Sequence, residues 1–309
     1  MFNTIAFLVG TTLMYSTPLI FTALGGVISE NSGVINIGLE GMMSLGAFVA
    51  AAVGYFTGNP WLGLLAGGLA GGILALFHAI ASVSLSADQT VSGIAINFIG
   101  PGLALFLSRK FFEGATMTKP LTLEQKVPKL FTVLGIKVTK NTPIDMIFNQ
   151  DLTVILAMLL TVALWFLFYR TKYGLHIRSV GEHPKAADTL GINVYKVRYF
   201  CVITSGILAG IGGGAMSIAV TSHFTAMIIS GHGFIAMAAM IFGKWKPHGA
   251  FFACIIFGFA QALVITIGGT TLNISSQLLA MLPYVLTLII LTGLGRAAAP
   301  AANGVPYET

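Results

Sequence analysis

The chain has 309 residues, of which 56% are hydrophobic and only 8% are charged. Soluble domains carry about 25% charged residues, so this composition excludes an ordinary water-soluble domain and predicts a surface that faces lipid. The net charge of +6 comes from a few short basic clusters, which do not form the basic stripe that a nucleic-acid-binding face needs.

Nine apolar segments have about the 20 residues that are needed to cross a bilayer. In chain order they are residues 5–28, 34–57, 61–86, 88–108, 151–169, 199–221, 226–243, 249–269 and 278–295. The first lacks the basic flank and cleavage site of a signal peptide, so it is expected to remain as a span. Because backbone polar groups in lipid must pair internally, each segment is predicted to be a helix. The predicted fold is an all-α membrane protein with about nine transmembrane helices in one domain over residues 1–309.

The basic clusters predict the orientation of the chain in the membrane. Residues 170–198, residues 244–246 and Arg296 are basic, and two predicted spans separate each from the next. Basic short loops face the cytoplasm, so these regions are expected on the cytoplasmic side and the loop 110–150 outside. That loop is also basic, but long loops cross the membrane largely regardless of charge.

An internal repeat is predicted from a shift of the chain by 187 residues, the separation of Pro60 from Pro247. The aligned positions share their residue type: Gly25 and Gly26 align with Gly212 and Gly213, Pro60 with Pro247, and Arg109 with Arg296. The halves, about 1–109 and 198–296, hold four spans each and are separated by one span, so their orientations are opposite. Inverted repeats are typical of transporters whose substrate binds near the bilayer midplane.

Glycine has two predicted roles in the first half. It recurs every four residues from Gly63 to Gly71, which predicts a helix face that another backbone approaches closely. Gly33, Gly38 and Gly41 instead interrupt the start of a span and permit irregular backbone there.

Two polar residues follow this interruption. Asn36 and Glu40 are four residues apart, so they share a face if the segment is helical. A carboxylate within the membrane is costly and by default faces a cavity or a partner. The alternative is that Glu40 lies at the aqueous end of a span and is solvated.

A second segment, residues 173–192, is predicted to be cytoplasmic. Pro184 suits the first position of a helix and Gly191 suits a position just past its end. Ala186 and Ala187 give the short helix between them a surface of small residues. This is typical of a docking element, with an ordinary cytoplasmic loop as the alternative.

Together these segments resemble the permeases of bacterial ABC importers for branched-chain amino acids, ribose and nucleosides, a type II importer fold. The cytoplasmic pattern of that family is matched by Gly174, Val180, Gly181, Glu182, Pro184, Ala186, Ala187, Gly191 and Ile192. The stretch from Ser32 to Phe48 resembles the nucleoside type, although Asn36 is shared with the amino-acid type. The resemblance implies an ATPase-coupling role for Gly181, Glu182, His183, Pro184, Lys185, Ala186, Ala187 and Gly191.

The resemblance also implies what surrounds the chain. We expect a multi-pass permease of the bacterial cytoplasmic membrane that carries nucleosides by alternating access. Expected partners are a cytoplasmic ATP-binding subunit, a second related permease in a heterodimer, and an external substrate-binding lipoprotein. No Walker-A motif occurs in the chain, so ATP is expected to be bound and hydrolysed by the partner, and no catalytic residue, metal or cofactor is expected here.

Polar residues in otherwise apolar spans are the candidates for the substrate pathway. They are Asn36, Glu40, Gln89, Thr90, Asn97, Ser230, His232 and Gln261. Most are uncharged, which suits a neutral solute that forms hydrogen bonds, but each is also of a type that bonds one helix to another. Permeases for simple sugars or branched-chain amino acids, and an ion-coupled secondary transporter, remain as alternatives.

Overall fold

The computed structural model describes residues 2–139, 142–268, 275, 278, 281–293 and 298–307. Its helices are α1 (Phe2–Asn31), α2 (Leu39–Thr57), α3 (Pro60–Ala79), α4 (Gln89–Phe111), α5 (Leu130–Val133), α6 (Pro143–Phe148), α7 (Leu152–Arg170), α8 (Lys172–Glu182), α9 (Pro184–Thr189), α10 (Val194–Ala215), α11 (His232–Phe242), α12 (Pro247–Gly268) and α14 (Leu282–Gly293). Short π-helical turns follow α3 (Ile80–Ser84) and α10 (Met216–Val220), and a 3-10 turn covers Leu123–Gln125. No β-strand occurs in the described ranges.

The all-α membrane fold is confirmed, whereas the predicted count of nine spans is not. Seven helices in the described part of the chain are long and apolar enough to cross a membrane. The predicted span 226–243 is wrong, because α11 has 11 residues and rises about 16 Å against the ~30 Å of a bilayer core. The predicted span 278–295 corresponds in part to α14, and Arg296 lies outside the described residues.

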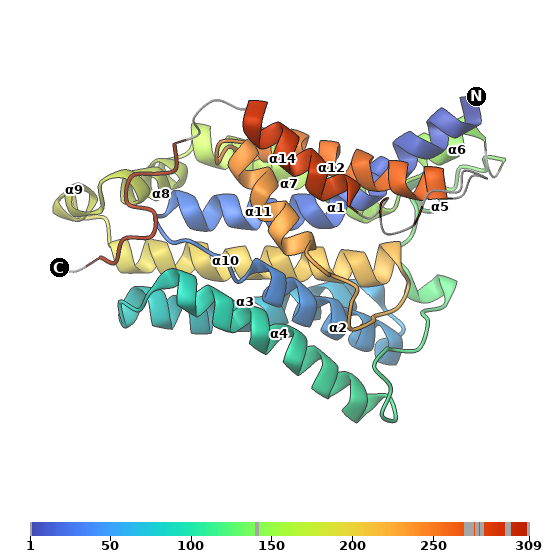
Figure 1. The fold of residues 1–309 in the computed structure, drawn as a ribbon, viewed down its shortest axis with the longest axis horizontal. Helices are drawn as coiled ribbons and strands as arrows, with labels where there is room; N and C mark the ends of the chain where they lie inside the picture. Colours follow the sequence, from blue (N-terminus) through green and yellow to red (C-terminus); the bar gives the residue numbers. More distant parts are fainter. Residues whose placement is uncertain are drawn as a thin grey trace.

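The long helices pack around α10. This helix lies beside α1, α2 and α3, while α1 also packs along α12 (Figure 1). The N-terminus lies with α5 and α6 at one end of the molecule, and α8, α9 and the C-terminus lie at the other (Figure 1). The segments that contain α5 and α6 and those that contain α8 and α9 therefore lie at opposite ends of the molecule (Figure 1).

The glycine face of α3 makes the close helix contacts that the sequence predicts. A Cβ atom at Gly67 would lie 2.7 Å from the carbonyl oxygen of Gly46 on α2. One at Gly71 would lie 2.2 Å from the carbonyl oxygen of Gly206 and 2.9 Å from the Cα of Gly210, both on α10. Three helices thus meet backbone to backbone, as small residues allow in lipid.

Replacing one of these glycines with leucine tests the packing. We expect Gly71→Leu to lower the Tm of the detergent-solubilised protein markedly, because neither backbone atom can move away as a flexible side chain would. The cost should reach at least the ~1–3 kcal/mol of ordinary overpacking. Gly102→Leu on α4 is the matched control, since nothing lies within 4 Å of its Cβ position. Equal Tm values for the two variants would contradict the close contact.

Candidate functional site

The chain leaves helical geometry between α1 and α2, where Ser32 to Gly38 form an irregular stretch that we call the first break. Gly33 has a φ of +87°, in the left-handed region that favours glycine. Backbone groups freed by such a break inside a membrane protein need partners from elsewhere. Side chains of α3 and α4 supply several of them.

Gln89 and His78 hold the middle of the first break. The backbone N–H of Ile35 donates to Oε1 of Gln89 over 2.7 Å, and the Ile35 carbonyl lies 2.9 Å from Nε2 of His78. The other ring nitrogen of His78 is 2.9 Å from the hydroxyl of Ser92 on α4. Gln89 and His78 are both buried. Gln89 is therefore a partner of the first break, and His78, which the sequence analysis did not single out, is another.

Asn97 holds the end of the break to the start of α2. Its Nδ2 donates to the Ile37 carbonyl over 2.9 Å, and its Oδ1 accepts from the Gly41 backbone N–H over 2.9 Å. This pair bridges the last non-helical residues and the first turn of α2. Asn97 thus acts as an external partner for the unpaired groups at a helix N-terminus.

Asn36 connects the break to the central helix. Its side chain is fully buried, and Nδ2 donates to the hydroxyl of Ser205 on α10 over 3.0 Å. Among the described buried side chains, Asn36 Oδ1 and Gln89 Nε2 are atoms without a hydrogen-bond partner. The first break therefore carries one unused acceptor and one unused donor. Ser205 was missed by sequence reasoning because 169 residues separate it from Asn36.

A second break, residues 221–231, precedes α11. Glu40, in the first turn of α2 just after the first break, bonds to the end of the second break and to α11. The Glu40 carboxylate is 9% exposed. Oε1 accepts from the Gly231 N–H over 2.6 Å and Oε2 accepts from the Gly233 N–H over 2.7 Å. A carboxylate at a helix N-terminus is favoured by the unpaired N–H groups and by the helix dipole. Glu40 is therefore neither solvated nor free, and it couples the start of α2 to the start of α11.

The remaining pathway candidates are not gathered at this site. Thr90 is exposed in the first turn of α4, where its N–H is capped by Asp88. Ser230 is exposed in the second break, and the ring of the half-buried His232 lies against the Ile229 carbonyl. Gln261 is half-buried on α12. Asn36, Glu40, Gln89 and Asn97 thus form one site, which we call the break cluster.

The short helix predicted between Pro184 and Gly191 is observed as α9. Pro184 occupies its first position, and Gly191 lies just past its end with a φ of +84°. Glu182, His183, Lys185 and Ala186 are exposed around it. Ala187 differs from the expectation of a small exposed surface: it is 2% exposed and packs against α8 and α10. Only one of the two alanines, Ala186, is open to a partner.

The opposite end of the molecule carries a cavity of about 1100 Å³ between the α2–α3 turn and the loop before α7. Lys126, Lys129 and Asp151 are among the residues that line it. Burial raises the pKa of Asp151 to about 6, although the positive charges of Lys129 and Lys126 lower it. Within the part of the chain that the structure describes, no group of three His, Cys, Asp or Glu side chains could hold a metal ion.

Comparisons with known proteins agree over almost the full chain. The family described as "Branched-chain amino acid transport system / permease component" matches residues 8–291. The guanosine ABC transporter permease protein NupQ of Bacillus subtilis is 48% identical over 98% of this chain and 97% of its own. The nucleoside ABC transporter permease protein NupC of Lactococcus lactis is 40% identical over 99% and 98%.

A third relative has a different printed substrate. The putative glucose ABC transporter permease protein TsgC13 of Haloferax volcanii is 34% identical over 83% of this chain and 76% of its own. No solved structure matches significantly. With its seven candidate spans and this likeness, the chain is a multi-pass membrane protein and belongs to the family of branched-chain amino acid transport system permease components.

Proposed function

We propose that this chain is the membrane-spanning permease subunit of an ABC importer that moves nucleosides across the cytoplasmic membrane by alternating access. The observation that carries the proposal is the full-length likeness to a guanosine permease and a nucleoside permease. Transport of a simple sugar is the second candidate, because a putative glucose permease is also 34% identical.

The chemistry of the break cluster supports a neutral solute. Three of its four side chains are uncharged amides, and the one carboxylate is already engaged with two backbone N–H groups. The unused acceptor of Asn36 and the unused donor of Gln89 match groups that a nucleobase or a sugar presents. We propose that these atoms face the substrate in the state that exposes the first break.

The helix contacts support two halves of inverted topology. In the proposed correspondence α1, α2, α3 and α4 are equivalent to α10, α11, α12 and α14. Both α3 and α12 begin at the aligned prolines Pro60 and Pro247. The contact of α1 with α12 then corresponds to that of α10 with α3. The two breaks occupy equivalent places, each before the second helix of its half, and Glu40 joins them.

Energy for transport is proposed to come from a cytoplasmic ATP-binding subunit that docks on α9. The exposed residues from Glu182 to Ala186 form the surface for this contact, and Gly181 and Gly191 set the bounds of the segment. NupB and NupC, two nucleoside ABC transporter permease proteins, come from the same Lactococcus strain. This supports a second related permease here. We further propose an external substrate-binding lipoprotein at the opposite end of the molecule, as the relatives' names as ABC transporter permeases imply.

Uptake of labelled nucleoside in cells with the intact transporter tests the proposal. We expect uptake that unlabelled nucleosides reduce and that glucose, ribose and leucine leave unchanged. It should stop on ATP depletion and survive an ionophore that collapses ion gradients. Competition by a sugar alone would favour the second candidate, and uptake that follows the ion gradient would contradict an ATP-driven importer.

The variant Glu40→Gln tests the link between the two breaks. A glutamine oxygen can accept from one N–H, while its amide group faces the other donor, so one charge-assisted bond is lost and one N–H is left unpaired. Each effect costs about 1–3 kcal/mol. We expect a lower Tm and about tenfold slower uptake. Glu113→Gln, on an exposed residue just after α4, is the control, and equal uptake by both variants would show that the link has no role in transport.

The variant Ala186→Glu tests docking at α9. A bulky charge on the exposed side of this helix should block a close contact, so we expect loss of ATPase capture by the purified permease and loss of uptake. The protein itself should keep its Tm, because Ala186 is exposed. Thr189→Glu, at the exposed end of the same helix, adds the same charge away from the proposed contact. Full ATPase capture by Ala186→Glu would exclude α9 as the docking helix.

A further inference from the structure

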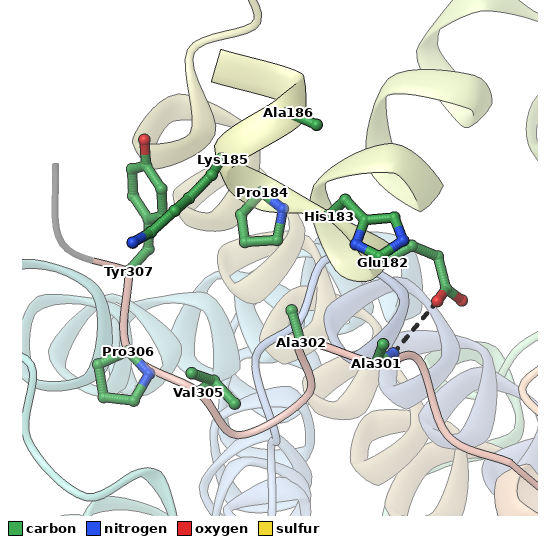
Figure 2. Close-up of a pocket in the computed structure, with 10 residues that line it drawn as sticks. All are labelled: Glu182, His183, Pro184, Lys185, Ala186, Ala301, Ala302, Val305, Pro306 and Tyr307. Carbon is green, nitrogen blue, oxygen red and sulfur yellow. Dashed lines mark hydrogen bonds between the residues drawn. The ribbon is translucent and has the colours of Figure 1, made fainter. Parts of the chain in front are cut away.

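The C-terminal segment lies across the cytoplasmic end of the helices rather than apart from them. Residues 300–307, which we call the strap, run alongside α8 and α9, with a cavity of about 550 Å³ between the strap and residues 182–186 (Figure 2). The strap follows the last helix of the chain and was not assigned any role from the sequence. Its contacts fall into two groups.

One group of contacts joins the strap to residues 181–191, which we call the coupling segment. The Ala302 N–H donates to the Gly181 carbonyl over 2.8 Å, and the Ala301 N–H donates to Oε2 of Glu182 over 3.3 Å (Figure 2). Farther along, Tyr307 is 6% exposed and completes a small hydrophobic core with Val180, Ala187 and Val194 of α8, α9 and α10. Its carbonyl also accepts from the hydroxyl of Tyr195 on α10 over 3.3 Å. The strap therefore packs with α8, α9 and α10 and helps to hold α9 in place.

The other group ties the strap to the end of α1 and the first break. The Gly304 N–H donates to the Gly33 carbonyl over 3.3 Å. Nδ2 of Asn303 donates to Oε2 of Glu30 over 2.9 Å, and Glu30 is 4% exposed. The same carboxylate oxygen accepts from Nε1 of Trp245 over 2.6 Å, in the turn between α11 and α12. One buried carboxylate therefore joins the strap, α1 and that turn.

The guanidinium of Arg198 holds the strap down between these two groups. Arg198 on α10 is 1% exposed, and its Nη1 donates to the Val305 carbonyl over 3.0 Å. Gly304 lies directly over the first break, because a Cβ atom there would be 2.8 Å from Cδ1 of Ile35. The distance along the chain is short: Gly304 is two positions after Ala302, and extended backbone covers at most about 3.6 Å per residue. The contacts that Ala302 and Gly304 make therefore cannot move far apart.

We propose that the strap fixes the coupling segment and the first break to each other, so that a displacement of α9 reaches the break cluster. This rests on the proposed function, in which α9 receives the movement of the ATP-binding subunit. Asn303 is the positioning residue on the break side and Tyr307 is the positioning residue on the coupling side. If α8 and α9 moved without α1, the hydrogen bonds on one side of the strap would have to break.

The test uses the whole transporter reconstituted in vesicles, with Asn303→Ala, Tyr307→Ala and the double variant. The measured quantity is the ratio of solute taken up to ATP hydrolysed, per assembled complex. We expect each single variant to lower this ratio about tenfold while hydrolysis and ATPase capture persist, since the exposed face of α9 is unchanged. The double variant should lower it little further, because Asn303 and Tyr307 act in series along one strap and their effects are therefore not independent. Ala299→Ser, exposed and outside the strap, is the control.

Two results would overturn the proposal. One is a wild-type ratio in either single variant. The other is a product of the two losses in the double variant, about a hundredfold, because independent effects multiply in rate. A fall in assembly alone, with a normal ratio in the complexes that form, would likewise make the strap a folding element only. If the wild-type transporter carries a sugar in place of a nucleoside, the ratio is measured with that sugar, so failure of the substrate proposal leaves this test intact.

Discussion

Every backbone group that leaves a helix inside a membrane has to be paired by something other than water. Several of the buried polar side chains serve this need. Gln89 and Asn97 on α4 pair with the backbone of the first break, and Glu40 on α2 pairs with the backbone at the start of α11. Because each of these side chains comes from a different helix than the backbone it serves, the breaks exist only in the packed protein.

This pairing requires the helices to approach one another closely, which the small residues of α3 and α10 allow. His78 on α3 and Ser205 on α10 reach the first break because the backbone contacts at Gly67 and Gly71 hold α2, α3 and α10 close together. Hydrophobic burial does not drive helix association in lipid, so close packing and hydrogen bonds between helices must do so. The glycines and the break cluster therefore depend on each other: one provides proximity, and the other fixes the register of the helices.

Local patterns in the sequence predicted the parts that local forces determine. Seven spans follow from apolar length, and the ends of α9 follow from Pro184 and Gly191. The apolar run 226–243 misled the prediction, because Gly231 and a carboxylate 191 residues away begin α11 inside that run. Asn36, Glu40, Gln89 and Asn97 were found as polar residues in spans, but their partners are backbone groups and Ser205, which no spacing indicates. Burial of Ala187 likewise depends on Tyr307, far along the chain.

The Glu40 contact sets the scale of the energy that a movement of the breaks would require. Its two charge-assisted hydrogen bonds are worth about 1.5–3 kcal/mol each, so separating α2 from the start of α11 would cost about 3–6 kcal/mol. Reversing a two-state equilibrium from 1:99 to 99:1 takes about 5.5 kcal/mol. A contact of this size is strong enough to hold one arrangement of the breaks at rest. It is also weak enough for a change of comparable size at the end that carries α9, which we propose is transmitted through the strap, to release it.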